Sequence, residues 1–464
     1  MRGSTVTEAG RRVVLEITGL THEGEGVGRE GDRAVFVPGA IPGDIVQATV
    51  VQDRKNYSRA ILDSVKEPSP LRVEPRCPVF EDCGGCSLQN MSYEGQLEWK
   101  RRLVEDALKR IGHLEGVTVN VTLPSEQRWH YRNKAMFPVG LGPAGNIIAG
   151  CYRKGTHRIV HASDCAIQHP TNNLILREAL RLVEEYDIPP YDECSGGGTL
   201  RHIMARVAVG TGESMAVFVT RSRRLPHAGR LAAELVRKVP GLVSVIQNVN
   251  PEKTNIVLGE EWRVVLGRGH IDDVLGNDRI GRLAFRISPL SFYQVNPIQA
   301  ARIYEKALEY AELEGSETAL DLYCGVGTIT LFMAGRVEMA YGIEEVPEAV
   351  RDAYRNARLN GIRNVRFIKG KAEWVLPSFA GANPRPRAVI LDPPRAGCDP
   401  GVLQVICRLR PKTLVYVSCY PSTLARDLRV LVQCGYRVAE VQPADMFPQT
   451  PHVECIAAIQ RIQG

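Results

Sequence analysis

Apolar and polar positions alternate over short distances in the first part of the chain. Residues 12–66 form β-rich runs separated by Gly, Pro and Asp turns, and this spacing predicts a small antiparallel barrel of the OB-like kind. Between the strands, residues 54–59 mix Arg, Lys and Tyr side chains, which is typical of surfaces that bind nucleic acid. A barrel that only spaces other domains is the alternative.

From about residue 286 onward, apolar strand-like runs alternate with helical segments. This order predicts a doubly wound, mainly parallel sheet, an α/β fold whose ligands bind beyond the carboxyl ends of the strands. Residues 347–361 are a predicted helix between two of these strands. The predicted strands occupy residues 318–324, 339–344, 365–370, 388–394 and 413–419.

The length of 464 residues predicts two or three domains. No apolar stretch approaches the roughly 20 residues that span a bilayer, and the opening residues 1–16 lack the apolar core of a signal peptide. We therefore expect a cytoplasmic protein with no membrane partner. The expected domains are a barrel at 1–70, a central α+β domain at 71–285 and an α/β domain at 286–464.

Basic and aromatic side chains gather in the middle of the chain, where residues 128–134 read RWHYRNK and residues 151–160 add more. Aromatic rings can stack on splayed bases while cations meet phosphates, although each residue alone could face the wet side of a strand. The net charge of +6 also points weakly to a polyanionic partner. Together these features indicate RNA, and the sequence indicates no obligate protein partner.

A glycine turn follows the first predicted strand of the α/β domain. Gly325 and Gly327 allow close approach of a ligand, although a tight structural turn is an equal explanation for them alone. Glu344 ends the next strand, where a carboxylate can bind the hydroxyls of a ribose. Because no complete G-x-G-x-x-G is present, we expect S-adenosylmethionine and not a dinucleotide. Two further candidate ligand contacts lie in DPPRAG and SFYQVNP, namely Asp392 and Gln294.

The twelve cysteines, without an export signal, argue for reduced thiols, metal ligands or catalysis more than for a disulfide framework. Three of them lie in one glycine-containing segment, CPVFEDCGGC, and a distant fourth in HASDCAIQHP completes a set. All-cysteine ligation fits a four-iron cluster or zinc, and three close thiols with one distant thiol favour the cluster. The set is Cys77, Cys83, Cys86 and Cys165, although Cys151 or Cys194 could replace the last.

Cys419 lies where the apolar run VYVS ends in a proline-containing turn. A free cysteine in such a place either packs in the core or acts as a nucleophile. With an ordinary pKa of about 8.5, a thiol is only slightly ionised at neutral pH, so a nucleophilic role requires surroundings that favour the thiolate.

The chain resembles the RNA uracil-5-methyltransferase family, specifically its 23S ribosomal-RNA branch, which carries a TRAM domain and an iron–sulfur centre. GEGVGR and VPGAIPGD carry the likeness to the TRAM domain, an RNA-binding barrel. The remaining motifs follow in order along nearly the whole chain: CGGCSLQ, HYRNKA, SFYQVN, DLYCGVGT, DPPRAG, SCYPSTLARD and DMFPQTPHVE.

The resemblance implies methyl transfer from S-adenosylmethionine to carbon 5 of a uridine in RNA. It implies that Cys419 adds to carbon 6 and that Glu454 later removes the hydrogen from carbon 5. The residues implied for S-adenosylmethionine binding are Gln294, Tyr323, Glu344 and Asp392. Those implied for a four-iron, four-sulfur (4Fe-4S) cluster are Cys77, Cys83, Cys86 and Cys165.

The resemblance also implies that residues 91–122 pack back on the catalytic domain. One position departs from the family pattern, because Tyr420 follows the proposed nucleophile where the family commonly has Asn. We expect His452 and Cys324 to be packed side chains without a direct role.

Three other functions compete with this interpretation. A transfer-RNA uracil methyltransferase shares the catalytic motifs, but its bacterial branch generally lacks the barrel and the four cysteines. An amine-directed methyltransferase typically has Asn-Pro-Pro where this chain has DPPR, and needs no thiol. A non-catalytic iron–sulfur RNA-binding sensor would retain only the cofactor fold.

Overall fold

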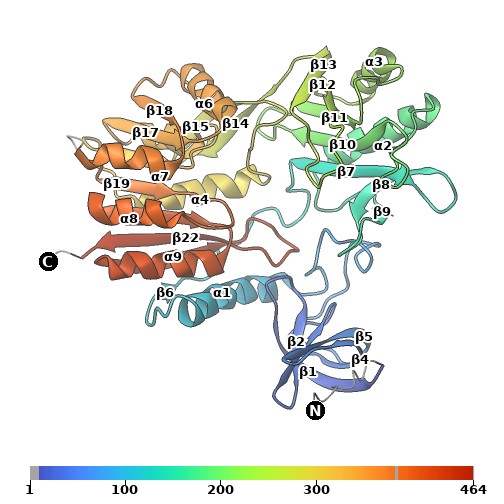
Figure 1. Cartoon of the computed structure of the whole chain (residues 1–464), viewed down its shortest axis with the longest axis horizontal. Helices are drawn as coiled ribbons and strands as arrows, with labels where there is room; N and C mark the ends of the chain where they lie inside the picture. Colours follow the sequence, from blue (N-terminus) through green and yellow to red (C-terminus); the bar gives the residue numbers. More distant parts are fainter. Residues whose placement is uncertain (1–9, 382–384, 463–464) are drawn as a thin grey trace, which may run out of the picture.

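The computed structural model describes residues 10–381 and 385–462, which form three parts (Figure 1). The small N-terminal barrel lies below, the central domain lies at the upper right, and the α/β unit forms the left side. Residues 1–9 of the predicted barrel domain lie outside the described residues. Within the described part of the chain, no helix combines the length and the apolar character that crossing a membrane would require.

The predicted barrel is confirmed, and it closes through pairing of its first and fourth strands. In the first strand every second side chain is buried, because alternate positions point into the barrel. The expectation of an antiparallel barrel is wrong for one pair: the third and fifth strands are parallel, because residues 38–44 cross the barrel before the fourth strand. The strands are β1 Arg12–Leu20, β2 Gly26–Glu30, β3 Arg33–Val37, β4 Ile45–Asp53 and β5 Tyr57–Glu67.

The central domain contains a 7-stranded sheet in the order β13-β12-β11-β10-β7-β8-β9. Every residue of β10 and β11 is buried, since helices α2 and α3 cover one face and the core shared with the α/β unit covers the other. Its elements are β7 Lys134–Leu141, β8 Ile147–Tyr152, β9 Ile159–His161, α2 Pro170–Glu185, β10 Leu200–Val207, β11 Ser214–Thr220, α3 Ala228–Lys238, β12 Leu242–Val249 and β13 Glu261–Gly267.

The α/β unit contains an 8-stranded sheet in the order β18-β17-β16-β19-β20-β22-β21-β6. All the predicted strands are present and mutually parallel, which confirms the predicted fold class. Two further strands, β21 and β22, were not predicted, and β22 runs antiparallel to both of its neighbours, β20 and β21. The elements are α4 Pro297–Tyr310, β16 Thr318–Leu322, α5 Thr328–Ala334, β17 Met339–Glu344, α6 Pro347–Leu359, β18 Val365–Lys369, α7 Ala372–Val375, the 3-10 helix Leu376–Gly381, β19 Ala388–Leu391, α8 Pro400–Leu409, β20 Thr413–Ser418, α9 Pro421–Gln433, β21 Tyr436–Ala444 and β22 Glu454–Arg461.

Several elements that begin before residue 286 also pack on the α/β unit. Helix α1, Tyr93–Arg110, lies along α9, and the short strand β6, Thr118–Val119, extends the sheet beside β21 (Figure 1). The hairpin of β14, Ile271–Asn277, and β15, Gly281–Ile287, packs on α4 and α6. Parts of the chain that precede the predicted boundary therefore contribute to this unit.

One pair of cysteines forms a disulfide that the sequence did not predict. Cys407 on α8 and Cys434 at the end of α9 form a disulfide, whose ends are 27 positions apart in the sequence. The two helices pack side by side, so thiols far from each other in sequence come within bonding distance. The remaining ten cysteines are free thiols.

Candidate functional site

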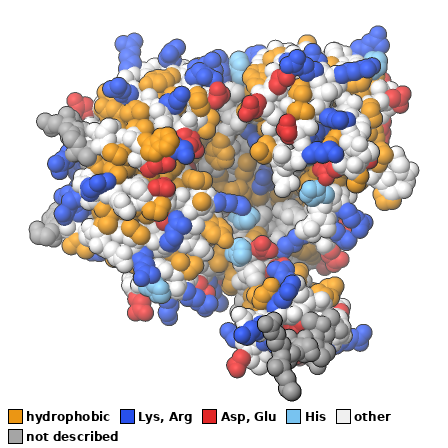
Figure 2. Space-filling view, in the orientation of Figure 1, with side chains coloured by type: hydrophobic (Ala, Val, Ile, Leu, Met, Phe, Trp, Pro, Cys, Tyr) orange, Lys and Arg blue, Asp and Glu red, His pale blue; other side chains and the backbone are white. Residues whose placement is uncertain are grey.

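A cavity of about 680 Å³ opens at the carboxyl ends of the parallel strands. Figure 2 shows a recess between the α/β unit and the central domain, with hydrophobic side chains in its depth. The cavity is lined by every residue that the sequence proposed for cofactor binding or catalysis: Gln294, Tyr323, Glu344, Asp392, Cys419 and Glu454. Cavities beyond strand ends are the usual ligand sites of such sheets.

The turn after β16 forms one wall of the cavity. Glu344 at the end of β17 accepts hydrogen bonds from the backbone N–H of Gly325, at 3.0 Å, and of Val346, at 2.8 Å. Gly327 has a φ of +83°, and a Cβ there would lie 2.8 Å from Phe367, so this position requires glycine. The Glu344 carboxylate is therefore fixed beside a turn that lets a ligand approach the backbone.

Two aspartates at adjacent strand ends also line this wall. Burial raises the pKa of Asp392 to about 7, and it raises that of Asp321 to about 7 as well. Asp321 accepts a hydrogen bond of 2.5 Å from the Thr330 hydroxyl and lies within the same cavity. Sequence reasoning did not select Asp321, although its position directly before the glycine turn, at the end of a buried strand, was a usable signal.

The thiol of Cys419 and the carboxyl of Glu454 meet because of sheet register. Strands β20 and β22 are antiparallel neighbours, and Ser418 pairs with Cys455. Cys419 directly follows Ser418 and Glu454 directly precedes Cys455, so the two residues lie at the same end of the two strands. Both residues line the cavity.

Burial is the main cause that raises the pKa of Cys419, to about 11. The nearby carboxyls of Glu454 and Asp392 raise it further, while the Arg395 side chain, which lines the same cavity, opposes them. Burial also raises the pKa of Glu454 well above its ordinary value. Arg395, which sequence reasoning missed within DPPRAG, is thus the cation that favours the thiolate.

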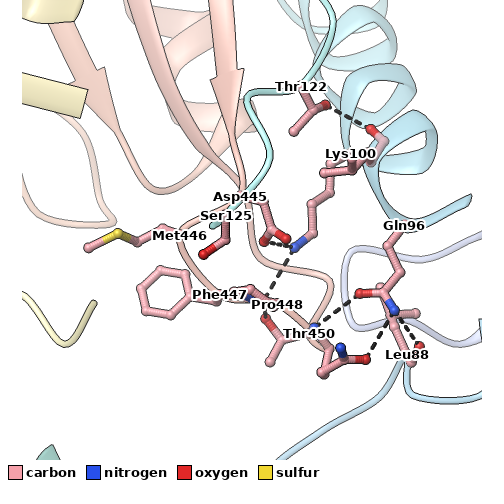
Figure 3. Close-up of polar contacts among 12 residues, drawn as sticks. Leu88, Gln96, Lys100, Thr122, Ser125, Asp445, Met446, Phe447, Pro448 and Thr450 are labelled. Carbon is pink, nitrogen blue, oxygen red and sulfur yellow. Dashed lines mark hydrogen bonds and ion pairs between the residues drawn. The ribbon is translucent and has the colours of Figure 1, made fainter. Parts of the chain in front are cut away.

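The segment that carries Glu454 to the cavity is anchored by helix α1. Figure 3 shows Lys100 reaching Asp445, at 2.5 Å, and the Phe447 carbonyl, at 3.2 Å. Gln96 on the same helix bonds to both the backbone and the side chain of Gln449. The family resemblance implied that residues 91–122 pack on this unit, but no local pattern identified Lys100 or Gln96 as the residues that anchor the loop.

His452 and Cys324 were expected to be packed side chains. Cys324 is buried in the glycine turn, as expected, although it also borders the cavity. His452 is exposed, lines the cavity and makes an edge-to-face contact with Phe447, with ring centroids 6.1 Å apart. The expectation for His452 is therefore wrong, because the loop before β22 turns this ring toward the recess.

A second cavity, of about 420 Å³, gathers the predicted cluster cysteines. Cys77, Cys83, Cys86 and Cys165 all line it, and so does Cys151, whereas Cys194 is exposed elsewhere. The loop is tightly folded, because a Cβ on Gly84 would lie 2.8 Å from the Tyr152 carbonyl oxygen. Arg132 and Lys134 also line the cavity, and burial together with the neighbouring arginines lowers the pKa of Lys134 to about 7.

The cysteines of this cavity could hold either zinc or an iron–sulfur cluster only if their thiols converge. Among the described residues, no three Cys, His, Asp or Glu side chains converge as a single metal ion would require, and zinc needs four ligands around one point. The five thiols therefore share a cavity with Arg132 and Lys134, but in the described part of the chain they do not form a metal-binding group.

The basic and aromatic segment 128–134 is largely structural. Tyr131 is buried and donates a hydrogen bond of 3.0 Å to the Pro448 carbonyl, so it cannot stack on a base. The Arg128 guanidinium covers the Tyr93 ring at 4.1 Å, and Lys134 faces the cysteine cavity. For Tyr131 the interpretation as a base-stacking ring is therefore wrong, since its packing and its hydrogen bond to the loop before β22 occupy it.

A parallel sheet with a ligand cavity at its strand ends, a glycine turn and an acidic residue at the next strand end defines an S-adenosylmethionine-dependent methyltransferase. The family described as tRNA (Uracil-5-)-methyltransferase matches residues 247–462, and the TRAM domain matches residues 6–62.

Two comparisons extend over the whole chain. An RNA methyltransferase of Halalkalibacterium halodurans is 46% identical over 96% of this chain and 97% of the relative. The solved structure of the Pyrococcus abyssi tRNA (uracil-54, C5)-methyltransferase, in complex with S-adenosyl-L-homocysteine, has a TM-score of 0.76 and 30% identity, and covers 97% of this chain and 100% of that chain. The chain belongs to the RNA uracil-5-methyltransferase family, and it is an S-adenosylmethionine-dependent RNA methyltransferase with an RNA-binding barrel.

Proposed function

We propose that this enzyme methylates carbon 5 of a uridine in RNA through a transient covalent bond between Cys419 and the uracil ring. The observation that carries this proposal is the placement of the Cys419 thiol near Glu454, in a cavity that also contains the residues expected to bind the cofactor. Carbon 5 of uracil is a weak nucleophile, so a thiol beside a carboxyl suits a reaction that must first activate the ring.

In the first step the Cys419 thiolate adds to carbon 6, and the ring electrons move onto the oxygen at carbon 4. Because burial raises the pKa of Cys419 to about 11, the thiol is protonated at rest. Before it adds, the thiol releases its proton to solvent, and the Arg395 side chain supplies the positive charge that favours the ionised sulfur.

In the second step carbon 5 of the resulting enolate takes the methyl group. S-adenosylmethionine, when bound, supplies this group on a positively charged sulfur and leaves as a neutral thioether. Glu454 then removes the hydrogen from carbon 5, and elimination restores the ring double bond and releases the Cys419 thiolate. A buried carboxyl with a raised pKa is a strong base once ionised, which suits removal of a carbon-bound proton.

The cofactor would be held at the opposite end of the same cavity. Glu344, fixed by two backbone N–H groups, would accept hydrogen bonds from the ribose hydroxyls. Gln294, Tyr323 and Asp392 line the adjoining wall and would orient the rest of the molecule toward Cys419.

We infer 23S ribosomal RNA as the substrate, because the family branch that acts on it carries both the barrel and the four cysteines found here. Transfer RNA is the second candidate, because the Pyrococcus enzyme, a tRNA (uracil-54, C5)-methyltransferase, aligns over 97% of the chain. Methyl transfer from labelled cofactor to separate 23S rRNA and tRNA transcripts, followed by mapping of 5-methyluridine, distinguishes the two.

A 4Fe-4S cluster held by Cys77, Cys83, Cys86 and Cys165 is part of the proposal. Methyl transfer moves no net electrons, so the cluster would stabilise the fold and take no part in the reaction. The segment that follows its cysteines is bonded to the loop before β22, through the N–H groups of Ser87 and Leu88 to the Gln449 carbonyl. The protein purified without oxygen should contain about four irons per chain, and Cys86→Ser should lose them.

The covalent step is tested with RNA that contains 5-fluorouridine, because fluorine cannot leave as a proton. We expect a stable protein–RNA adduct whose bond maps to Cys419 by mass spectrometry. Cys419→Ala should form no adduct and transfer no methyl group while it still binds RNA, and the exposed Cys194→Ala is the matched control. Full methyl transfer by Cys419→Ala would refute the mechanism.

A further inference from the structure

His22, in the loop between β1 and β2 of the barrel, touches Tyr420 of the α/β unit. The two rings meet edge to face, with centroids 6.2 Å apart and planes at 86°. Tyr420 follows Cys419 directly and stands at the N-terminal end of α9. A barrel side chain therefore comes within one residue of the proposed nucleophile.

The loop that carries His22 is held in one conformation. The Thr21 hydroxyl accepts hydrogen bonds from the N–H groups of Glu23, at 3.2 Å, and Glu25, at 3.1 Å. Gly24 has a φ of +78°, and a Cβ there would lie 3.0 Å from the Ser87 side chain and 3.5 Å from that of Pro451. The loop thus packs closely against both the cysteine segment and the loop that leads to Glu454.

Ion pairs also hold the barrel loop that carries His22 in place. The Glu25 side chain is only 3% exposed and forms ion pairs with Arg59 of the barrel, at 3.0 Å, and with Lys154 of the central domain, at 3.7 Å. The barrel loop is therefore tied to both neighbouring parts of the molecule, and the position of His22 beside Tyr420 is set before any ligand binds.

The two rings are not covered. The His22 side chain is 60% exposed and Tyr420 is half-buried, so each ring keeps free surface, and Tyr420 directly follows Cys419 in the chain. Figure 2 shows histidine side chains at the lower edge of the recess, on the side nearest the barrel.

A uridine that reaches Cys419 must leave the stack of its neighbours, which then lack a stacking partner. Aromatic side chains commonly replace that partner in single-stranded RNA complexes. We propose that His22 and Tyr420 form a stacking subsite for the nucleotide adjacent to the target uridine, so that barrel and α/β unit jointly select the sequence context. This inference rests on the proposed function for the identity of the target base, but not on the covalent step.

The test measures binding of 15-nucleotide single-stranded RNAs with one central uridine to the chain carrying Cys419→Ala. In matched RNAs, the base on the 5′ or the 3′ side of the uridine is removed to leave an abasic ribose. We expect loss of one of these bases to weaken binding roughly tenfold by fluorescence anisotropy. With Tyr420→Ala or His22→Ala added, removal of that base should weaken binding little. With Tyr420→Phe added, which keeps an aromatic ring, removal of the base should again weaken binding roughly tenfold.

The matched control is Tyr186→Ala. Tyr186 stacks on His227 in the central domain, with centroids 5.3 Å apart, and lines neither the Cys419 cavity nor the cysteine cavity. This variant should keep the whole penalty for the abasic RNA. The subsite would be overturned if the protein that retains both His22 and Tyr420 binds all the RNAs with equal affinity. It would also be overturned if Tyr420→Ala loses as much affinity for the abasic RNA as the protein with Tyr420. If the penalty behaves as expected but the unaltered enzyme methylates no uridine, the proposed function fails and the subsite stands.

Discussion

The ammonium group of Lys100 lies 2.5 Å from a carboxylate oxygen of Asp445, and both side chains are completely buried. The two residues are 345 positions apart in the sequence. Lys100 belongs to α1, and Asp445 begins the loop that leads to Phe447, His452 and Glu454 (Figure 3). A buried ion pair therefore fixes the loop that delivers the proposed base to the cavity.

Removing one partner of this pair should be far more harmful than removing both. Lys100→Met leaves the Asp445 charge buried and unpaired, and we expect it to lower the free energy of unfolding by about 3–5 kcal/mol in urea titrations. The double variant Lys100→Met/Asp445→Asn should recover part of this loss. Lys109→Met, at the exposed end of the same helix, is the control, and a Lys100→Met protein as stable as this control would contradict the prediction.

Glu454→Gln should separate methyl transfer from product release. Without a base the methylated adduct cannot eliminate, so we expect turnover to fall by a factor of about 10² to 10⁴ and a covalent complex with ordinary RNA to accumulate. Denaturing gels with labelled RNA detect that complex. Glu348→Gln, on the exposed surface of α6, should turn over normally. A slow Glu454→Gln enzyme that accumulates no adduct would show that Glu454 acts before methyl transfer.

The reactivity of Cys419 should depend steeply on pH. Burial raises the pKa of this thiol to about 11, so the thiolate is scarce at pH 7. Its alkylation by iodoacetamide should therefore accelerate about tenfold per pH unit up to that value. Mass spectrometry of the Cys419 peptide gives the rate, with the exposed Cys194 as the internal reference.

Removal of the Arg395 charge should shift the pH profile of Cys419 alkylation toward higher pH. Its side chain lowers the pKa of Cys419, so Arg395→Met should raise that pKa and slow alkylation at every pH below it. Arg408→Met, exposed in the last turn of α8, is the matched control. An unchanged or faster reaction in Arg395→Met would remove Arg395 from the account of thiolate stabilisation.

The Cys407–Cys434 disulfide should make the stability of the α/β unit sensitive to reductant. It closes a loop of 27 residues, for which loss of chain entropy in the unfolded state predicts about 3.5 kcal/mol. Dithiothreitol should lower the urea midpoint of the wild type, while Cys434→Ser should start low and not respond. A wild-type midpoint unmoved after complete reduction, verified by thiol titration, would contradict the prediction.

Local features of the sequence determined a large part of this protein. Alternation in residues 12–66 and the strand–helix order after residue 286 specified the barrel and the parallel sheet, because both patterns reflect which faces are buried. The glycine turn and Glu344 could be related without a structure, since consecutive parallel strands end at the same sheet edge.

Tertiary packing decided which distant surfaces meet. The Lys100–Asp445 pair, the burial of Tyr131, the turning of His452 toward the cavity and the contact of His22 with Tyr420 all join segments that no local pattern relates. Periodicity and turn chemistry act over a few residues, whereas such contacts depend on how whole domains pack. The sequence by itself therefore determined the chemistry available to this enzyme, and the packing of its domains decided how that chemistry is positioned and where RNA can reach it.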